Sequence, residues 1–212
     1  VSTRDVVVVR TNYRLGALGW FTHPSIQGSQ EGTDKTSNFG TLDIIQSLEW
    51  VQGNISAFGG DPSNVTIFGE SAGGHNVFAL LSSPLADGLF HKAISQSGYT
   101  SSYSLEDAVN ENGTNRLIER GSSQIIDRVF GSGVDKNLLR SKLKEMDARA
   151  FIGLYYQEDG IDSIPLTTRD GIVIPEVGLL EALSRPEYAK NIPVMAGANK
   201  DEVSLWHGLH RY

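Results

Sequence analysis

The residues best suited to chemistry lie in the pentapeptide GESAG at positions 69–73, which fits the pattern Gly-x-Ser-x-Gly. A strand pattern, VTIF, precedes it directly, and a helical pattern follows. This order predicts a sharp strand-to-helix turn, on which Gly69 and Gly73 clear space and the Ser71 hydroxyl projects above the end of a sheet. Ser71 is therefore the predicted nucleophile. The Ala72 N–H, at the start of the helix, is the predicted donor to a developing oxyanion.

A serine hydroxyl becomes a good nucleophile when a base, usually a histidine oriented by a carboxylate, removes its proton. In chains with this turn, the acid follows the nucleophile at the end of a later strand. The pattern IPVMA at 192–196 is such a strand, and Asp201 and Glu202 come shortly after it. Spacing alone does not choose between these two carboxylates. A solvated loop with charge at a helix N-terminus is the alternative for both.

The sequence contains five histidines that are candidates for the base. His75 follows Ser71 by one helical turn, and we expect its side chain to point along the helix rather than at the hydroxyl. For every histidine we expect a surface or loop position. The five are His23, His75, His91, His207 and His210.

Strand patterns alternate with helical patterns, which predicts an α/β fold with central parallel strands and flanking helices. The strand patterns are 5–9, 65–68, 93–96 and 192–196, the helical patterns are 38–55 and 72–83, and 12–16 and 21–37 are predicted as turn and loop. The stretch from about 101 to 190 has denser charge and amphipathic patterns near 105–130 and 136–149. We interpret the chain as one partial domain over 1–212, with a core of 1–100 and 191–212 and a helical insertion of about 101–190.

The composition excludes several classes of protein. The net charge of −7 disfavours a nucleic-acid partner, because an acidic surface repels phosphates. No apolar run approaches the roughly 18 residues of a membrane span. The absence of cysteine excludes disulfides, thiolate metal sites and thiol catalysis. We expect no metal and no cofactor. The oligomeric state stays open, as does the location (secreted, periplasmic or cytoplasmic).

Short motifs along most of the chain resemble those of type B carboxylesterases, the family that includes bacterial p-nitrobenzyl esterases and the cholinesterases. They are NYRLG at 12–16, NFG at 38–40 with Asp43, FGGDP at 58–62, VTIFGESAGG at 65–74, QSG at 96–98 and NKDE at 199–202. The resemblance implies an α/β-hydrolase fold, present in part, and a serine ester hydrolase. It implies a Ser-Glu-His triad, an acyl-enzyme and a small-molecule ester substrate.

The resemblance also assigns roles that spacing leaves open. It implies that Glu202 is the triad acid, that Ser97 supports the acid, and that Glu70 is a buried carboxylate beside the nucleophile. For Glu70, a structural hydrogen-bond acceptor and a catalytic helper remain equal alternatives. The family's His-Gly-Gly run and its catalytic histidine both fall outside this chain. We therefore expect an internal fragment of a longer esterase, marginally stable and nearly inactive by itself.

Two other functions are compatible with the same scaffold. A non-catalytic binding or adhesion relative would have lost the nucleophile, and the presence of Ser71 and Glu202 argues against it. Peptidase or lipase chemistry would use the same turn, because substrate choice lies in the pocket rather than in the nucleophile. The sequons at Asn54, Asn64 and Asn112 are interpreted as chance matches.

Overall fold

The computed structural model describes residues 5–110, 121–155, 165 and 167–202. The chain divides into two compact units. The first unit consists of residues 1–10, 45–100 and 179–212, and the second consists of residues 11–44 and 101–178. The predicted division into a core and an inserted helical region stays a prediction.

The first unit contains a parallel sheet of three strands in the order β1-β2-β3. The strands are β1 (Thr66–Glu70), β2 (Lys92–Gln96) and β3 (Val194–Gly197). Their registers pair Glu70 with Gln96 and Gln96 with Gly197, so all three carboxyl ends lie at one edge of the sheet. Three of the four predicted strands are thus confirmed, with small shifts at their ends.

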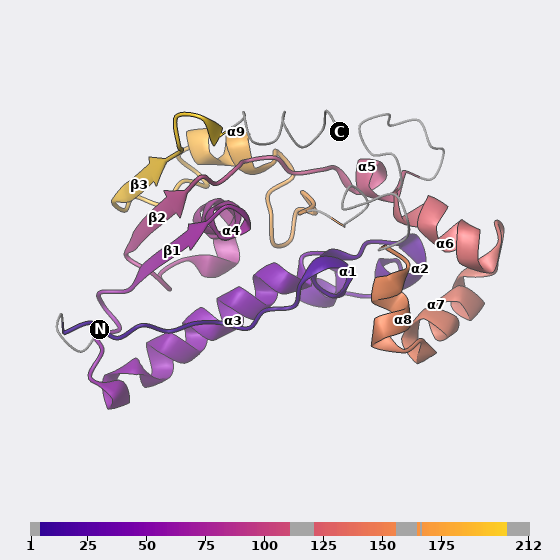
Figure 1. The fold of residues 1–212 in the computed structure, drawn as a ribbon, viewed down its shortest axis with the longest axis horizontal. Coiled ribbons are helices and arrows are strands. Elements are labelled where there is room, and N and C mark those ends of the chain that lie inside the picture. The colour runs from indigo at the N-terminus through magenta and orange to yellow at the C-terminus, as the bar shows by residue number, and fades with distance from the viewer. Residues whose placement is uncertain (1–4, 111–120, 156–164, 166, 203–212) are drawn as a thin grey trace. The chain divides into compact units, whose positions relative to one another are not determined.

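Helix α4 (Ala72–Ser82) packs against β1 and β2, and helix α9 (Leu179–Ser184) packs against α4 (Figure 1). The buried side chains of α4 include Val77, Leu80 and Leu81, and Ile67 and Ala93 are buried on the strands. This apolar stripe confirms the predicted helix of 72–83. A short 3₁₀ helix, Pro84–Ala86, follows it.

The strand predicted for residues 5–9 is wrong. Val6, Val7, Val8 and Val9 are between 40% and 51% exposed, and no described strand pairs with them. A β-branched run favours an extended backbone, but a strand forms only where a neighbouring backbone offers hydrogen bonds. In the described sheet, β1 is bonded to β2 and its other edge has no strand.

Helix α3 (Phe39–Asn54) confirms the predicted helix of 38–55. Its buried residues Ile45, Leu48 and Val51 follow the helical repeat. The helix continues into a short 3₁₀ helix, Ile55–Phe58, which ends at Gly59 with a left-handed φ of 79°. A glycine suits this turn because side chains disfavour such a backbone.

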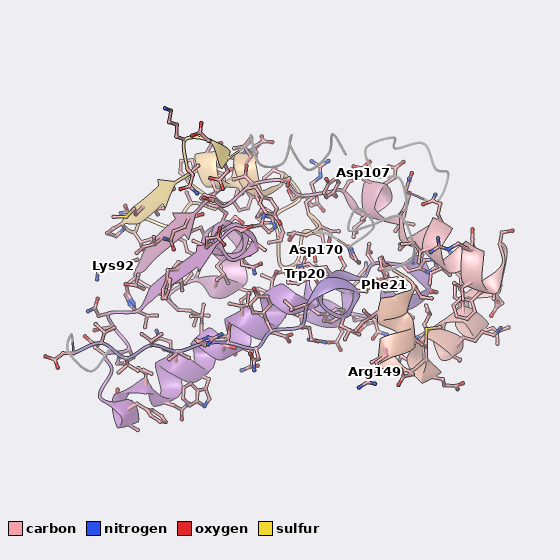
Figure 2. All side chains as sticks on the ribbon, viewed as in Figure 1. Trp20, Phe21, Lys92, Asp107, Arg149 and Asp170 are labelled. Atoms are coloured by element: carbon pink, nitrogen blue, oxygen red, sulfur yellow. The ribbon has the colours of Figure 1, made fainter. Side chains whose placement is uncertain are left out.

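The second unit is helical in its described part, and its elements are α1 (Gly16–Trp20), α2 (Pro24–Gln27), α5 (Leu105–Val109), α6 (Ser122–Phe130), α7 (Lys136–Glu145), α8 (Ala148–Gly153) and a 3₁₀ helix (Gly32–Lys35). Its core contains Phe21, which Figure 2 labels, together with buried side chains of α6 and α7. The Phe21 ring contacts Phe151 of α8 at 5.0 Å between ring centroids. The predicted turn at 12–16 leads into α1 at Gly16, and the predicted loop at 21–37 contains α2 and the 3₁₀ helix.

The two long amphipathic patterns of this unit become shorter helices. The pattern near 136–149 is interrupted because Asp147 accepts the backbone N–H groups of Arg149 and Ala150, which begins a new helix. The pattern near 105–130 contains α5 and α6, and its middle lies outside the described residues. No helix in the described part of the chain has the length and hydropathy of a membrane span.

Candidate active site

Ser71 lies at the junction between β1 and α4, at the carboxyl edge of the sheet. Its backbone has φ 56° and ψ −114°, a conformation that is rare for residues other than glycine. The Ser71 N–H donates to the Gln96 carbonyl oxygen at 2.9 Å, and the Ser71 carbonyl accepts the His75 N–H at 2.9 Å. The side chain is exposed. These bonds hold a strained backbone in place, as is typical of functional positions.

Glycines allow the close approach of backbone segments around this turn. A Cβ on Gly69 would lie 2.4 Å from the Gly73 carbonyl, and a Cβ on Gly74 would lie 2.8 Å from the Gly98 Cα. Among the described residues, a Cβ on Gly73 would meet nothing within 4 Å, so the predicted role of Gly73 in clearing space for the turn is wrong for this part of the chain. Gly74 and Gly98 belong to two of the motifs that carry the resemblance, VTIFGESAGG and QSG, but no packing role was predicted for them.

Ala72 is the first residue of α4. The N–H groups of the first helical turn have no intrahelical acceptor and carry the positive end of the helix dipole. The Ala72 amide therefore stands next to the serine with the polarity that a developing oxyanion requires.

Glu202 is bound at the same edge of the sheet, after β3. Its Oε2 accepts the Ser97 hydroxyl at 2.9 Å and the Asn199 N–H at 2.6 Å. Ser97 itself follows β2 with φ 51°, and its N–H donates to the Gly197 carbonyl at 2.7 Å. Glu202 is half-buried, whereas the neighbouring Asp201 is exposed. Asp201 and Glu202, between which spacing alone does not choose, thus differ in their burial and in their hydrogen bonds.

Glu70 is exposed, so the buried position that the resemblance implies is wrong for the described structure. Glu70 is the last residue of β1, and β1 is an edge strand of the described sheet. One side of the strand therefore has no neighbouring strand that could cover the carboxylate.

The expected surface or loop position is wrong for His75, which is 5% exposed within α4. His23 lies in a loop, as expected, and is 9% exposed there, where its Nδ1 accepts the Ser25 N–H and caps α2. His91 is half-buried, and its Nδ1 accepts the Val65 N–H. The other two histidines, His207 and His210, lie outside the described residues.

The ring of His75 packs against the segment that follows β2. It stacks on the Tyr99 ring with centroids 4.3 Å apart and planes 16° apart, and its Nδ1 donates to the Tyr99 carbonyl at 2.8 Å. Burial lowers the pKa of His75, and the bond to the Tyr99 carbonyl opposes this shift in part. The ring is therefore neutral at neutral pH. Within the described ranges, no group of three or more His, Asp or Glu side chains could hold a metal ion.

Known proteins share both the sequence and the fold of this chain. The model of the carboxylesterase family matches residues 1–210. Liver carboxylesterase 1 of Oryctolagus cuniculus is 36% identical over 205 residues, which cover 93% of this chain and 34% of that protein. Para-nitrobenzyl esterase of Bacillus subtilis (strain 168) is 34% identical over 204 residues, which cover 95% of this chain and 38% of that protein.

Solved structures agree with the sequence matches. A PNB esterase superimposes with a TM-score of 0.72 and 32% identity, over 92% of this chain and 38% of its own. A carboxylesterase of Geobacillus stearothermophilus gives a TM-score of 0.74 and 31% identity, over 94% of this chain and 40% of its own. The parallel strands and flanking helices are thus part of an α/β-hydrolase fold. The chain belongs to the carboxylesterase family, and it spans between 34% and 40% of the length of these relatives.

Proposed function

We propose that the protein is a serine carboxylic-ester hydrolase in which Ser71 is the nucleophile and Glu202 is the acid of the triad. The observation that carries the proposal is the backbone of Ser71, which is held at positive φ between a strand and a helix and leaves the side chain exposed. Membership of the carboxylesterase family supports the reaction class. The substrate is a small neutral ester, and no cofactor takes part.

In the proposed first step, the Ser71 hydroxyl oxygen attacks the ester carbonyl and its proton passes to a histidine. That histidine is expected from the resemblance and lies outside the described residues. Glu202 orients the imidazole and stabilises its cation. Ser97 and the Asn199 N–H fix the Glu202 carboxylate in turn, as their hydrogen bonds to Oε2 suggest.

The tetrahedral oxyanion that forms is stabilised by the Ala72 N–H, together with donors supplied from elsewhere in the protein. Collapse of this intermediate breaks the bond to the alcohol, which leaves with the proton from the histidine. Water then attacks the acyl-enzyme, gives its proton to the histidine, and releases the carboxylic acid and free Ser71. Glu70 takes no step in this scheme.

The proposal is tested on the protein expressed from its complete coding sequence. Hydrolysis of p-nitrophenyl acetate and labelling by a fluorophosphonate are measured for the wild type, Ser71→Ala and Glu202→Gln. Ser56→Ala is the matched control, because Ser56 is an exposed serine of the same unit. We expect Ser71→Ala to lose hydrolysis and labelling and Glu202→Gln to lower kcat by about 10³ to 10⁴-fold. Ser56→Ala should behave as the wild type.

Two outcomes would overturn the assignment. Labelling that persists in Ser71→Ala would move the nucleophile to another residue. A folded wild type that neither hydrolyses the ester nor takes the label would instead indicate a non-catalytic binding relative of the same fold.

A further inference from the structure

The proposed mechanism leaves one buried titratable side chain near the nucleophile unused. His75 is 5% exposed, and its backbone N–H is bonded to the Ser71 carbonyl. Its ring does not face solvent but lies flat against Tyr99, which belongs to the segment after β2. The Tyr99 carbonyl can only accept a hydrogen bond, so the His75 Nδ1 must carry the proton. The ring thus makes two separate contacts with one neighbour.

These two contacts join the segments that carry the two proposed catalytic groups. On one side is the first turn of α4, which begins at Ser71. On the other side is the segment 97–99, in which the Ser97 hydroxyl binds the Glu202 carboxylate two residues before Tyr99. The backbones of Gly74 and Gly98 come so close between them that neither could carry a Cβ without displacement. A small rotation of either segment would therefore displace the other.

We propose that His75 is a positioning residue, which locks the Ser97–Tyr99 segment onto the first turn of α4 and so keeps Ser97 and Glu202 in register with Ser71. This role rests on the proposed ester-hydrolase function and extends it to a residue that touches no reacting atom. The ring packs and donates at once, through its stack on Tyr99 and its bond to the Tyr99 carbonyl.

Two variants separate the two contacts. His75→Asn keeps an amide donor near the position of Nδ1 and loses the stacked ring, whereas His75→Phe keeps a ring and loses the donor. The matched control is His91→Asn. The His91 ring also bonds a backbone group of the same unit, the Val65 N–H at 3.2 Å, but at the amino edge of the sheet.

The readouts are kcat and KM for p-nitrophenyl acetate, the fluorophosphonate labelling rate, and backbone hydrogen exchange of residues 97–99. We expect both His75 variants to lower kcat by about tenfold and to change KM by less than about twofold. A misplaced Glu202 would stabilise the transition state less, whereas binding of the substrate would change little. Exchange over 97–99 should rise in both. His91→Asn should lower the melting temperature with kcat and the exchange of 97–99 unchanged. If the His75 variants do not fold, Tyr99→Leu replaces them. Tyr99 is 42% exposed, and this substitution removes the ring that stacks on His75 while the backbone carbonyl of residue 99 stays in place.

A merely structural histidine would give a different pattern. The proposal is overturned if the His75 variants, or Tyr99→Leu in their place, lose thermal stability as His91→Asn does while kcat stays at the wild-type value. It is also overturned if exchange over 97–99 does not change. The exchange measurement needs no activity. An inactive wild type would therefore refute the ester-hydrolase proposal alone, while the effect of His75 on the segment could still be read.

Discussion

The backbone of Ser71 has φ and ψ values close to those of the first central residue of a type II′ turn, where glycine is strongly favoured. A non-glycine residue held in such a conformation costs about 1–3 kcal/mol. We therefore predict that Ser71→Gly is more stable than Ser71→Ala by about 1 kcal/mol, since the backbone entropy of glycine offsets part of the relief. Urea unfolding of the two variants checks this. Equal stabilities would mean that the turn is not strained.

The burial of His75 predicts that the free energy of unfolding depends on pH. Burial lowers its pKa below the ordinary 6.5, so the unfolded chain binds this proton more readily than the folded one. The stability that His75 contributes is then fully present above about pH 6.5 and is lost as the pH falls from there through the folded pKa. The free energy of unfolding of the wild type, measured between pH 8 and 5, should approach that of His75→Phe as the pH falls. A gap that widens instead would contradict the lowered pKa.

Individual residues were predictable where a local pattern carries the chemistry. The place of Ser71 on a strand-to-helix turn follows from a pentapeptide in its strand and helix context. The proposal of Glu202 over Asp201 needed the resemblance, because the hydrogen bond that Glu202 accepts comes from Ser97, 105 residues earlier in the chain. The burial of His75 could not be predicted, since the side chain that covers it, Tyr99, comes from another segment. The exposure of Glu70 likewise depends on which strands lie beside β1.

At the scale of elements, the contact between α4 and the segment after β2 depends on Gly74 and not on its neighbour Gly73. A Cβ on Gly74 would lie 2.8 Å from the Gly98 Cα, whereas a Cβ on Gly73 would meet none of the described atoms within 4 Å. Gly74→Ala should therefore destabilise the protein by about 1–3 kcal/mol through overpacking. Gly73→Ala should be neutral or stabilising by up to about 1 kcal/mol, because alanine favours the helix. Thermal unfolding compares the two, and a larger loss for Gly73→Ala would show that the described packing is wrong.

Helices and strands could be predicted from the sequence where the pattern of their own residues determines their type. The helices α3 and α4 carry their apolar stripe in sequence, and β1 and β2 are short apolar runs between turn residues. Residues 6–9 form a run as β-branched as any strand in the chain, yet they form none, because a run carries no information about its neighbour. The break near residue 147 arises from a capping aspartate that competes with a continuous amphipathic pattern.

At the scale of the whole molecule, the second unit is tied together by Asp170 (Figure 2). Its Oδ1 accepts the backbone N–H groups of residues 172–174 at 3.0 to 3.1 Å, and its Oδ2 accepts Asn38 Nδ2 at 2.9 Å and the Thr36 hydroxyl. Asp170→Asn should cost about 3 kcal/mol, because bonds to a charged acceptor are replaced and an amide faces buried donors.

Asp147→Asn is the control for this prediction. Asp147 also accepts two backbone N–H groups, but at an exposed helix start, where Asn caps nearly as well. Its loss should stay below about 0.5 kcal/mol. Guanidinium unfolding of both variants measures the difference, and equal losses would show that Asp170 is a local cap rather than a link between distant segments.

The described sheet ends in β3, a short strand whose four residues are all exposed. Such an edge presents unpaired backbone groups to other chains, and its apolar side chains favour pairing. We predict that these 212 residues, expressed alone, associate with rising concentration, and that Met195→Lys reduces the association because a charge on the edge opposes a second strand.

Leu180→Lys is the matched control. Leu180 is 70% exposed and Met195 is 68% exposed, but Leu180 lies on helix α9. Sedimentation velocity should show the larger effect for Met195→Lys, and equal effects would attribute the association to apolar surface in general rather than to strand pairing.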